Sequence, residues 1–182
     1  MHNGQIKRLN WGCGGCGEPG WINSDIKSGP RVDLCCDIRQ GLPIGDNSFD
    51  YAVSVHALQE IPIADVVPVL GELRRVLKPK GVLRLVLPDL EKGFRAYQRG
   101  DREYFMVPDD DAKCLSGKFV YQILWYGYSR TLFTGDFIDE LLRNAGFGRT
   151  TACQFRQTHG PFEGIIELDS RPQESLFVEA VK

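Results

Sequence analysis

A run of glycine and cysteine, residues 12–17, follows a short apolar segment near the start of the chain. Glycine has no side chain to block an approaching molecule, and it adopts positive φ angles at little cost. A glycine loop at the end of a first strand therefore brings bare backbone close to a ligand, a pattern typical of sites for nucleotide-like molecules. The sequence predicts such a site at this loop.

Acidic residues follow the next two predicted strands, at Asp25 and Asp37. Ligands of open α/β sheets bind at the carboxyl ends of the strands, where a carboxylate can accept two hydrogen bonds from a ribose diol. Asp25 could be such a ribose-binding acid. Both residues also suit a structural role: Asp25 could begin the turn at residues 27–30, and Asp37 could cap the turn that follows it.

Alternating and continuous apolar patterns predict the elements that position these residues. Five strands are expected, at residues 6–11, 21–26, 32–36, 49–55 and 82–87. Few residues separate the first two strands, so the helix that usually joins parallel neighbours is expected to be truncated. An amphipathic helix is predicted at residues 65–78, with Asp65 as its cap, Pro68 in its first turn and Pro79 at its end.

Residues 93–133 form an expected insertion, which we interpret as a lid over the substrate pocket. Residues 94–133 hold 10 of the 19 aromatic residues, and these rings could equally form a small core of their own. The acidic triplet at residues 109–111 is interpreted as a solvated loop and not a metal site. A capped helix from Thr134 and two strands, at residues 149–155 and 174–181, are predicted to complete the chain.

The motifs together resemble those of class I S-adenosylmethionine (SAM) dependent methyltransferases. The likeness begins with Leu-Asn-x-Gly-Cys-Gly at residues 9–14 and Gly-Trp-Ile-Asn-x-Asp at residues 20–25. It continues through Asp37 and Ile38, residues 42–50 and residues 72–81, and more loosely through residues 134–182. The resemblance implies a Rossmann-like α/β fold with a mostly parallel sheet and an antiparallel last strand.

The resemblance also implies roles for residues at the strand ends. Gly12, Cys13 and Gly14 would hold the methionine part of SAM. The remaining expected cofactor contacts are Asp25 at the ribose, Asp37 and Ile38 at the adenine, and also Ile26 and His56.

Two residues are candidates for catalysis, namely His56 and Tyr126. Related sequences read His-x-Leu-Glu-His at the loop of His56, but Glu60 occupies the place of the second histidine. His56 could position a substrate, take a proton near neutral pH, or make a purely structural contact. Tyr126 is proposed because it carries a hydroxyl group within the expected lid.

Length and composition are those of one globular domain, residues 1–182, with 42% hydrophobic residues. The net charge of -2 provides no basic surface for nucleic acid. No apolar run is long enough for a membrane span, and the amino terminus lacks a signal-peptide core, so a cytoplasmic location is expected. The six cysteines are then expected to be reduced. A homodimer is possible.

The predicted function is methyl transfer from SAM to an unidentified, small-molecule acceptor, with S-adenosylhomocysteine as the product. One alternative is a binding or scaffold protein without catalysis that acts as a partner subunit. A second is an NAD(P)-dependent oxidoreductase, because Gly12, Gly14 and Gly17 satisfy G-x-G-x-x-G, although Pro19 and Gly20 oppose the helix that this motif needs. Weaker alternatives are a zinc site at Cys13 and Cys16 with either Cys35 or Cys36, and a redox pair at Cys13 and Cys16; no metal is expected.

Overall fold

A seven-stranded sheet with the order β3-β2-β1-β4-β5-β7-β6 organises the computed structural model, which describes residues 6–15 and 17–182. The strands are β1 (Arg8–Trp11), β2 (Ile22–Asp25), β3 (Leu34–Cys35), β4 (Phe49–Val55), β5 (Leu77–Pro88), β6 (Arg149–Cys153) and β7 (Ser175–Val181). All neighbouring strands are parallel except that β7 is antiparallel to both β5 and β6. The predicted Rossmann-like α/β fold, with its antiparallel last strand, is confirmed.

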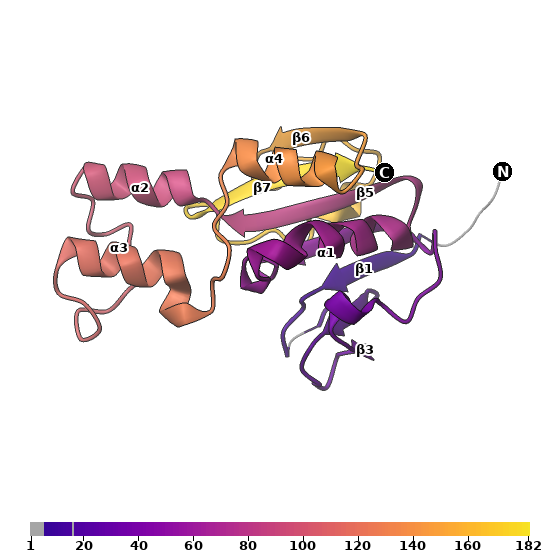
Figure 1. The fold of residues 1–182 in the computed structure, drawn as a ribbon, viewed down its shortest axis with the longest axis horizontal. Helices are drawn as coiled ribbons and strands as arrows, with labels where there is room; N and C mark the ends of the chain where they lie inside the picture. The colour runs from indigo at the N-terminus through magenta and orange to yellow at the C-terminus, as the bar shows by residue number, and fades with distance from the viewer. Residues whose placement is uncertain (1–5, 16) are drawn as a thin grey trace.

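Among the residues that the structure describes, four α-helices accompany the sheet: α1 (Ile63–Val76), α2 (Leu90–Gln98), α3 (Leu115–Leu124) and α4 (Gly135–Asn144). Helices α1 and α4 lie side by side on one face of the sheet, whereas α2 and α3 project beyond the end of β5 (Figure 1). Short 3₁₀ helices occur at Ile38–Gln40, Leu58–Glu60, Trp125–Gly127 and Glu163–Ile166. No helix in the described part of the chain has the length and apolar character that a membrane span requires.

Each face of the sheet has its own apolar cluster. Under α1 and α4, Leu70, Leu73 and Ile138 pack with Leu9 and Leu85 of the strands, all fully buried. On the other face, Tyr51 and Val53 pack with Ile165, so the segment around the Glu163–Ile166 helix covers that side. Strand β5 is therefore buried on both faces, as its continuous apolar run predicts.

Strands β1 and β2 are parallel neighbours, yet residues 12–21 alone join them, without a helix among the described ones. Asn23 supports this short connection. Its side-chain oxygen accepts hydrogen bonds from Asn10 Nδ2 at 3.0 Å and from the backbone N–H of Glu18 at 2.9 Å. A Cβ atom on Gly17 would lie only 2.3 Å from the carbonyl oxygen of Arg31, so the connection also needs glycine there.

Helix α1 differs from its prediction at both ends. It begins at Ile63 with Pro62 as the cap residue, so the predicted capping role of Asp65 is wrong, because Asp65 lies inside the first turn. Pro68 is consequently the sixth helical residue and not part of the first turn, and it lacks the N–H that would bond to the carbonyl of residue 64. The helix ends at Val76, two residues early, because Leu77 is already extended and pairs with Phe49 as the first residue of β5.

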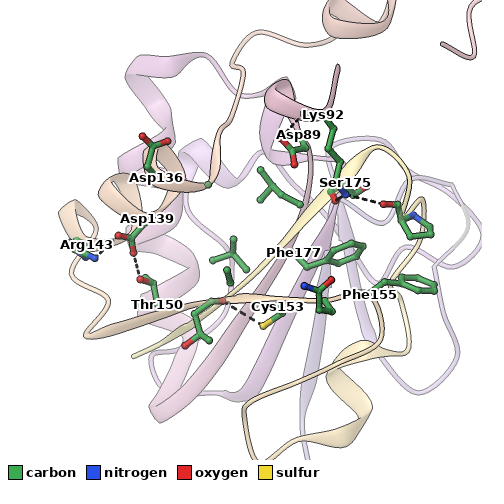
Figure 2. Close-up of a pocket in the computed structure, with 17 residues that line it drawn as sticks. Asp89, Lys92, Asp136, Asp139, Arg143, Thr150, Cys153, Phe155, Ser175 and Phe177 are labelled. Carbon is green, nitrogen blue, oxygen red and sulfur yellow. Dashed lines mark hydrogen bonds and ion pairs between the residues drawn. The ribbon is translucent and has the colours of Figure 1, made fainter. Parts of the chain in front are cut away.

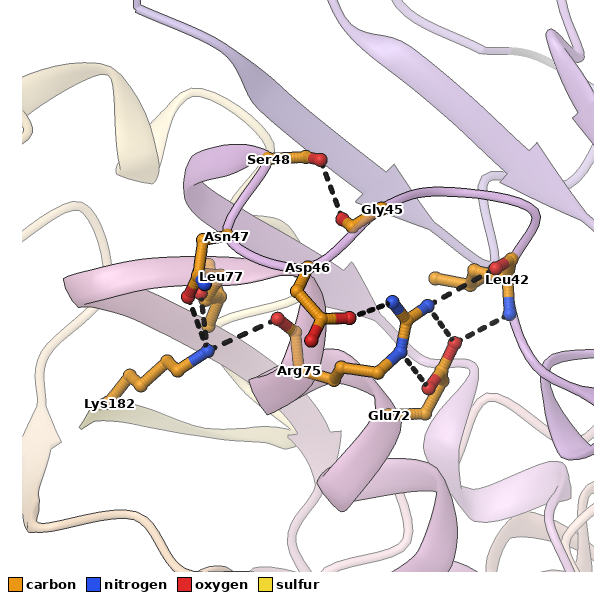
Figure 3. Close-up of polar contacts among 9 residues, drawn as sticks. All are labelled: Leu42, Gly45, Asp46, Asn47, Ser48, Glu72, Arg75, Leu77 and Lys182. Carbon is orange, nitrogen blue, oxygen red and sulfur yellow. Dashed lines mark hydrogen bonds and ion pairs between the residues drawn. The ribbon is translucent and has the colours of Figure 1, made fainter.

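Arg75, near the end of α1, forms hydrogen bonds that hold the loop leading into β4 in place (Figure 3). Its guanidinium forms two hydrogen bonds of 2.7 Å with the Glu72 carboxylate and one of 2.6 Å with Asp46. Glu72 in turn accepts a hydrogen bond of 2.6 Å from the backbone N–H of Leu42. Lys182 donates to Asn47 Oδ1 in the same loop, at 2.9 Å. The motif residues at 42–50 and 72–81 therefore have a structural role.

Arg84 is fully buried in β5 and uses all five of its N–H donors. Two go to the Asp169 carboxylate at 2.6 Å and one to Glu179 at 2.8 Å. The other two go to the backbone carbonyls of Gln154 and Gln157. This network attaches the segment between β6 and β7 to the centre of the sheet.

Replacing this arginine is expected to destabilise the protein strongly. Arg84→Met leaves two buried carboxylates without their cation, which costs about 3–5 kcal/mol of the free energy of unfolding. Urea denaturation monitored by circular dichroism measures this loss. Arg95→Ala is the matched control, because its ion pair with Glu91 is about half exposed and contributes less than about 1 kcal/mol. Similar losses in the two variants would contradict the assignment.

Candidate functional site

A cavity of about 780 Å³ opens at the carboxyl ends of β1, β2 and β4. This volume lies within the range of typical small-molecule sites. It is lined by all eight residues expected to contact a cofactor: Gly12, Cys13, Gly14, Asp25, Ile26, Asp37, Ile38 and His56. The structure thus gathers residues from four separate loops around one space.

The glycine loop follows a tight path along the wall of this cavity. Gly12 and Gly14 have φ angles of 70° and 63°, and the backbone N–H of Gly12 donates to the carbonyl of Ser24 at 2.8 Å. A Cβ atom on Gly12 would lie 2.2 Å from the Cβ atom of Ala57, whereas one on Gly14 would meet nothing within 4 Å. Gly12 therefore allows the loop to approach the end of β4, and Gly14 leaves open space at the cavity.

Asp25 fixes the position of the glycine loop from the end of β2. One carboxylate oxygen accepts the backbone N–H of Gly14 at 2.8 Å, and the other accepts that of Lys27 at 2.9 Å. The contact with Lys27 is the turn role considered from the sequence. A carboxylate has about four acceptor positions, so two hydrogen bonds leave capacity for a ligand hydroxyl. The structural and ligand-binding roles of Asp25 are therefore compatible.

Asp37 lies at the third strand end and caps the helix Ile38–Gln40. Its carboxylate accepts the backbone N–H of Arg39 at 3.0 Å and pairs with the Arg39 guanidinium at 2.6 Å. The hydrogen bond with the guanidinium lowers the pKa of Asp37, so the carboxylate is ionised at neutral pH. Arg39 lines the same cavity, and this ion-pair partner was not predicted from the sequence.

His56 follows β4 with a φ angle of 50°, an unusual backbone conformation for a residue with a side chain. Its Nε2 lies 2.7 Å from Ser175 Oγ, and its Nδ1 lies 3.2 Å from a guanidinium nitrogen of Arg171. Because arginine only donates, Nδ1 is the acceptor and Nε2 carries the proton. Burial, and then the charge of Arg171, lower the pKa of His56 to about 4. The ring is neutral near pH 7, and both of its nitrogens have hydrogen-bond partners.

A smaller cavity of about 140 Å³ adjoins the large one, and His56, Glu60 and Arg171 line both. Arg171 lies in the segment between β6 and β7, where an exposed arginine ordinarily points into solvent. The structure instead brings its guanidinium to His56, although the side chain is 48% exposed. The sequence carries no local signal for this contact, because 115 residues separate the two partners.

Tyr126, the second catalytic candidate, does not line either cavity. Its hydroxyl donates to Asp111 at 2.6 Å, in an exposed position. Its neighbours Gly127 and Tyr128 line the large cavity, and Trp125 lines the small one. The expected lid therefore borders both cavities through other residues.

A third hollow, of about 580 Å³, lies along the edge of the sheet between β6, β7 and α4 (Figure 2). Its charged residues already have partners within the fold. Lys92 donates to the carbonyls of Pro172 and Ser175, Asp139 pairs with Arg143, and Asp89 caps α2. None of the residues expected from the sequence to bind a ligand lines this hollow.

Two alternative sites were considered from the sequence. Within residues 6–15 and 17–182, no three His, Cys, Asp or Glu side chains converge closely enough to hold a metal ion. The proposed pair of Cys13 and Cys16 cannot be assessed, because Cys16 lies outside the described residues. The dinucleotide motif needs a helix after the glycine loop, but the next element along the described chain is β2.

Substitution of Gly12 should be more damaging than substitution of Gly14. Gly14→Ala is expected to cost about 1–2 kcal/mol for its positive φ angle. Gly12→Ala carries the same cost and about 1–3 kcal/mol more for the overlap with Ala57. Denaturant titration of both variants tests this order. The double variant Gly12→Ala/Ala57→Gly should regain only the stability lost to the overlap between the two Cβ atoms. Equal losses of stability in Gly12→Ala and Gly14→Ala would refute the role of Gly12 in the close approach to Ala57.

The buried His56 predicts a pH dependence of stability. Its pKa is about 4 when folded and about 6.5 when unfolded, so the unfolded state binds more protons between these values. Stability from this group is complete above about pH 6.5 and declines as the pH falls toward 4. Urea denaturation at pH 7.5 and 4.5 should show a smaller decline for His56→Gln than for the original protein. In nuclear magnetic resonance spectra, a His56 imidazole that titrates near pH 6.5 would contradict this prediction.

Part of the chain is similar in sequence to known proteins. Residues 12–85 match the family model described as a methyltransferase domain. A demethylmenaquinone methyltransferase of Listeria welshimeri is 32% identical over 128 residues, which cover 64% of this chain and 49% of that protein. A demethylmenaquinone methyltransferase of Listeria monocytogenes is 37% identical over 75 residues, which cover 38% of this chain and 31% of that protein. The chain thus spans about half or less of the length of these relatives.

Solved structures share the fold over nearly the whole chain. A SAM-dependent methyltransferase of Thermotoga maritima, described as a possible histamine N-methyltransferase, has a TM-score of 0.59 with 19% identity. The alignment covers 98% of this chain and 83% of that one. A SAM-dependent methyltransferase of Archaeoglobus fulgidus has a TM-score of 0.61 with 13% identity, and the alignment covers 97% of this chain and 86% of that one. The chain thus contains a segment that matches a methyltransferase domain, and it shares its fold with SAM-dependent methyltransferases.

Proposed function

We propose that the protein transfers the methyl group of SAM to a small-molecule acceptor and releases S-adenosylhomocysteine. The observation that supports this most directly is the grouping of eight expected contact residues around one cavity of about 780 Å³. When bound, SAM supplies a methyl group on a positively charged sulfur, which a nucleophile can displace directly. The protein must therefore hold and align two molecules, and alignment alone can account for much of the rate.

The residues around the cavity fit the parts of SAM. Gly12, Cys13 and Gly14 would lie along the methionine part, where the absence of a side chain at Gly14 leaves room for it. Asp25 would accept hydrogen bonds from the ribose hydroxyls with the acceptor positions that Gly14 and Lys27 leave unused. Asp37 and Ile38 would contact the adenine, with the Asp37 carboxylate held in place by Arg39.

His56 would act as a positioning residue in this scheme. Its low pKa makes the ring a weak base at neutral pH, and Ser175 and Arg171 hold both of its nitrogens. We therefore assign His56 to shaping the boundary between the two cavities. Tyr126 receives no role in the reaction, because it lines neither cavity.

Residues 93–133, within a single domain of residues 1–182, would act as the lid over the acceptor. Gln122, Trp125 and Ser129 from this segment line the small cavity. The backbone N–H groups of Arg130 and Thr131 attach the end of the lid to the carbonyl of Gln59, at 2.7 and 3.0 Å. We further propose a cytoplasmic protein that acts on a small molecule and not on nucleic acid, with a homodimer as a possible assembly.

Calorimetric titration tests the cofactor assignment. SAM and S-adenosylhomocysteine should bind with micromolar affinity, and NADH should not bind. Asp25→Ala should weaken SAM binding at least ten-fold, because it removes the acceptor for the ribose diol and the partner of Gly14. Circular dichroism checks that the variant stays folded.

Asp110→Ala is a suitable control, because Asp110 is exposed in the lid and lines neither cavity. Unchanged SAM affinity in Asp25→Ala would refute the ribose assignment. Absence of SAM binding by the original protein would refute the proposed function and favour the scaffold alternative. SAM binding without methyl transfer to any small acceptor would favour a binding protein.

A further inference from the structure

The small cavity beside His56 has an unusual set of polar groups. It lies between the loop after β4, the end of the lid and the residues that lead into β7. Its lining consists of His56, Gln59, Glu60, Pro88, Gln122, Trp125, Ser129, Arg171 and Glu174. At about 140 Å³ it is smaller than a typical ligand site, so it suits one polar group of a molecule that enters from the large cavity.

Gln59 lines this cavity and contains a buried acceptor atom. The residue is only 6% exposed, and its Nε2 donates to the carbonyl of His56 at 2.5 Å. That hydrogen bond fixes the orientation of the amide, and Oε1 then has no hydrogen-bond partner. An unsatisfied buried acceptor destabilises the folded protein, and a hydrogen bond from a ligand N–H or O–H group would remove this cost.

Glu174 presents a second acceptor. One carboxylate oxygen accepts the Gln122 amide at 2.8 Å, while the other is buried without a hydrogen bond. Arg171 is close to that second oxygen, but at 3.6 Å it is too distant for a hydrogen bond. Burial raises the pKa of Glu174, so the site stabilises this carboxylate poorly and would gain from a donor or a positive charge.

Glu60 contributes a third acceptor where the two cavities meet. Its side chain is accessible to solvent, yet partial burial and the nearby Asp25 charge raise its pKa, against the opposing effects of Lys27 and Arg130. A carboxylate that borders both cavities and also reaches water can take a proton from a ligand and release it to solvent.

We propose that this cavity binds the methyl acceptor through an amino group, with Gln59 and Glu174 as its hydrogen-bond acceptors and Glu60 as its proton acceptor. This inference rests on the proposed function. A hydroxyl group donates one hydrogen bond, whereas an ammonium group donates three and also carries a positive charge. Glu60 and Glu174 outnumber the one lining cation, Arg171, so the charge of the cavity also favours an amine.

The reaction is balanced as an N-methylation. The ammonium group gives one N–H proton to the Glu60 carboxylate, which frees the nitrogen lone pair. That pair forms the new N–C bond with the methyl carbon, while the C–S bond breaks and leaves its electron pair on sulfur. The products are an N-methylammonium ion and S-adenosylhomocysteine, and Glu60 releases its proton to water.

Binding of a matched pair of probes tests the inference. The protein is saturated with S-adenosylhomocysteine and titrated calorimetrically with benzylamine and with benzyl alcohol, which differ only in the polar group. Benzylamine should bind at least ten-fold more tightly. Glu174→Gln and Gln59→Leu should each reduce this preference at least five-fold and leave S-adenosylhomocysteine affinity within two-fold.

Methyl transfer tests Glu60 separately. With SAM and benzylamine as substrates, Glu60→Gln should lower the turnover rate at least ten-fold, because the substitution removes the proton acceptor and general-base catalysis typically contributes more than ten-fold to the rate. The affinity for benzylamine should change less than the turnover rate. This side chain is exposed, so the variant should fold. Glu91→Gln is the control, since Glu91 is exposed on α2 and lines neither cavity.

The outcomes separate this inference from the proposed function. Equal binding of amine and alcohol, binding of neither, or an amine preference that survives both acceptor substitutions would overturn the amine assignment while SAM binding persists. Failure to bind S-adenosylhomocysteine would overturn the proposed function, and the amine site with it.

Discussion

The short connection between β1 and β2 is the constraint that shapes the cavity. A parallel crossover usually takes a dozen or more residues and a helix, but here ten residues suffice. The described residues between β1 and β2 form no helix, so they aim no helix dipole at the ligand from that side. The loop is held instead by the Asn23 side chain and by the Asp25 carboxylate on the N–H of Gly14. On the side of the glycine loop, the cavity is therefore bordered by backbone and carboxylate groups and not by a helix.

The elements that the sequence predicts best are those whose pattern is local. Strand β4 has the predicted bounds, Phe49–Val55, because a mostly apolar segment, interrupted only by Asp50 and Ser54, follows a clear turn. Helix α4 begins after Thr134, as its capping pattern indicates. The start of α1 is wrong by two residues because Pro62 can precede a helix as well as Asp65 can cap one. Strand β3 has only two residues, since its length depends on pairing with β2 and not on its own composition.

The site was predictable where a strand end places a residue, and not where tertiary packing does. The glycine loop, Asp25 and Asp37 each follow a strand, so the fold alone brings them to one edge. Arg171 reaches His56 only because the Arg84 network attaches the preceding segment to β5. Tyr126 lies two residues from Tyr128, and the turn at Trp125–Gly127 directs only one of the two tyrosines toward the large cavity. Side-chain direction within a turn has no periodic signal in the sequence.

The position of β7 between β5 and β6 also bears on how the chain folds. Val82 pairs with Val181, so the pairing joins residues about a hundred positions apart in the sequence. Strand β6 pairs within the sheet through β7, and it cannot join until β7 has docked. Closing long loops costs chain entropy before any contact repays it, and folds rich in such distant pairs reach the native state slowly. The half of the sheet that holds α4 is therefore expected to assemble last, after β1 to β5 have formed a nucleus around α1.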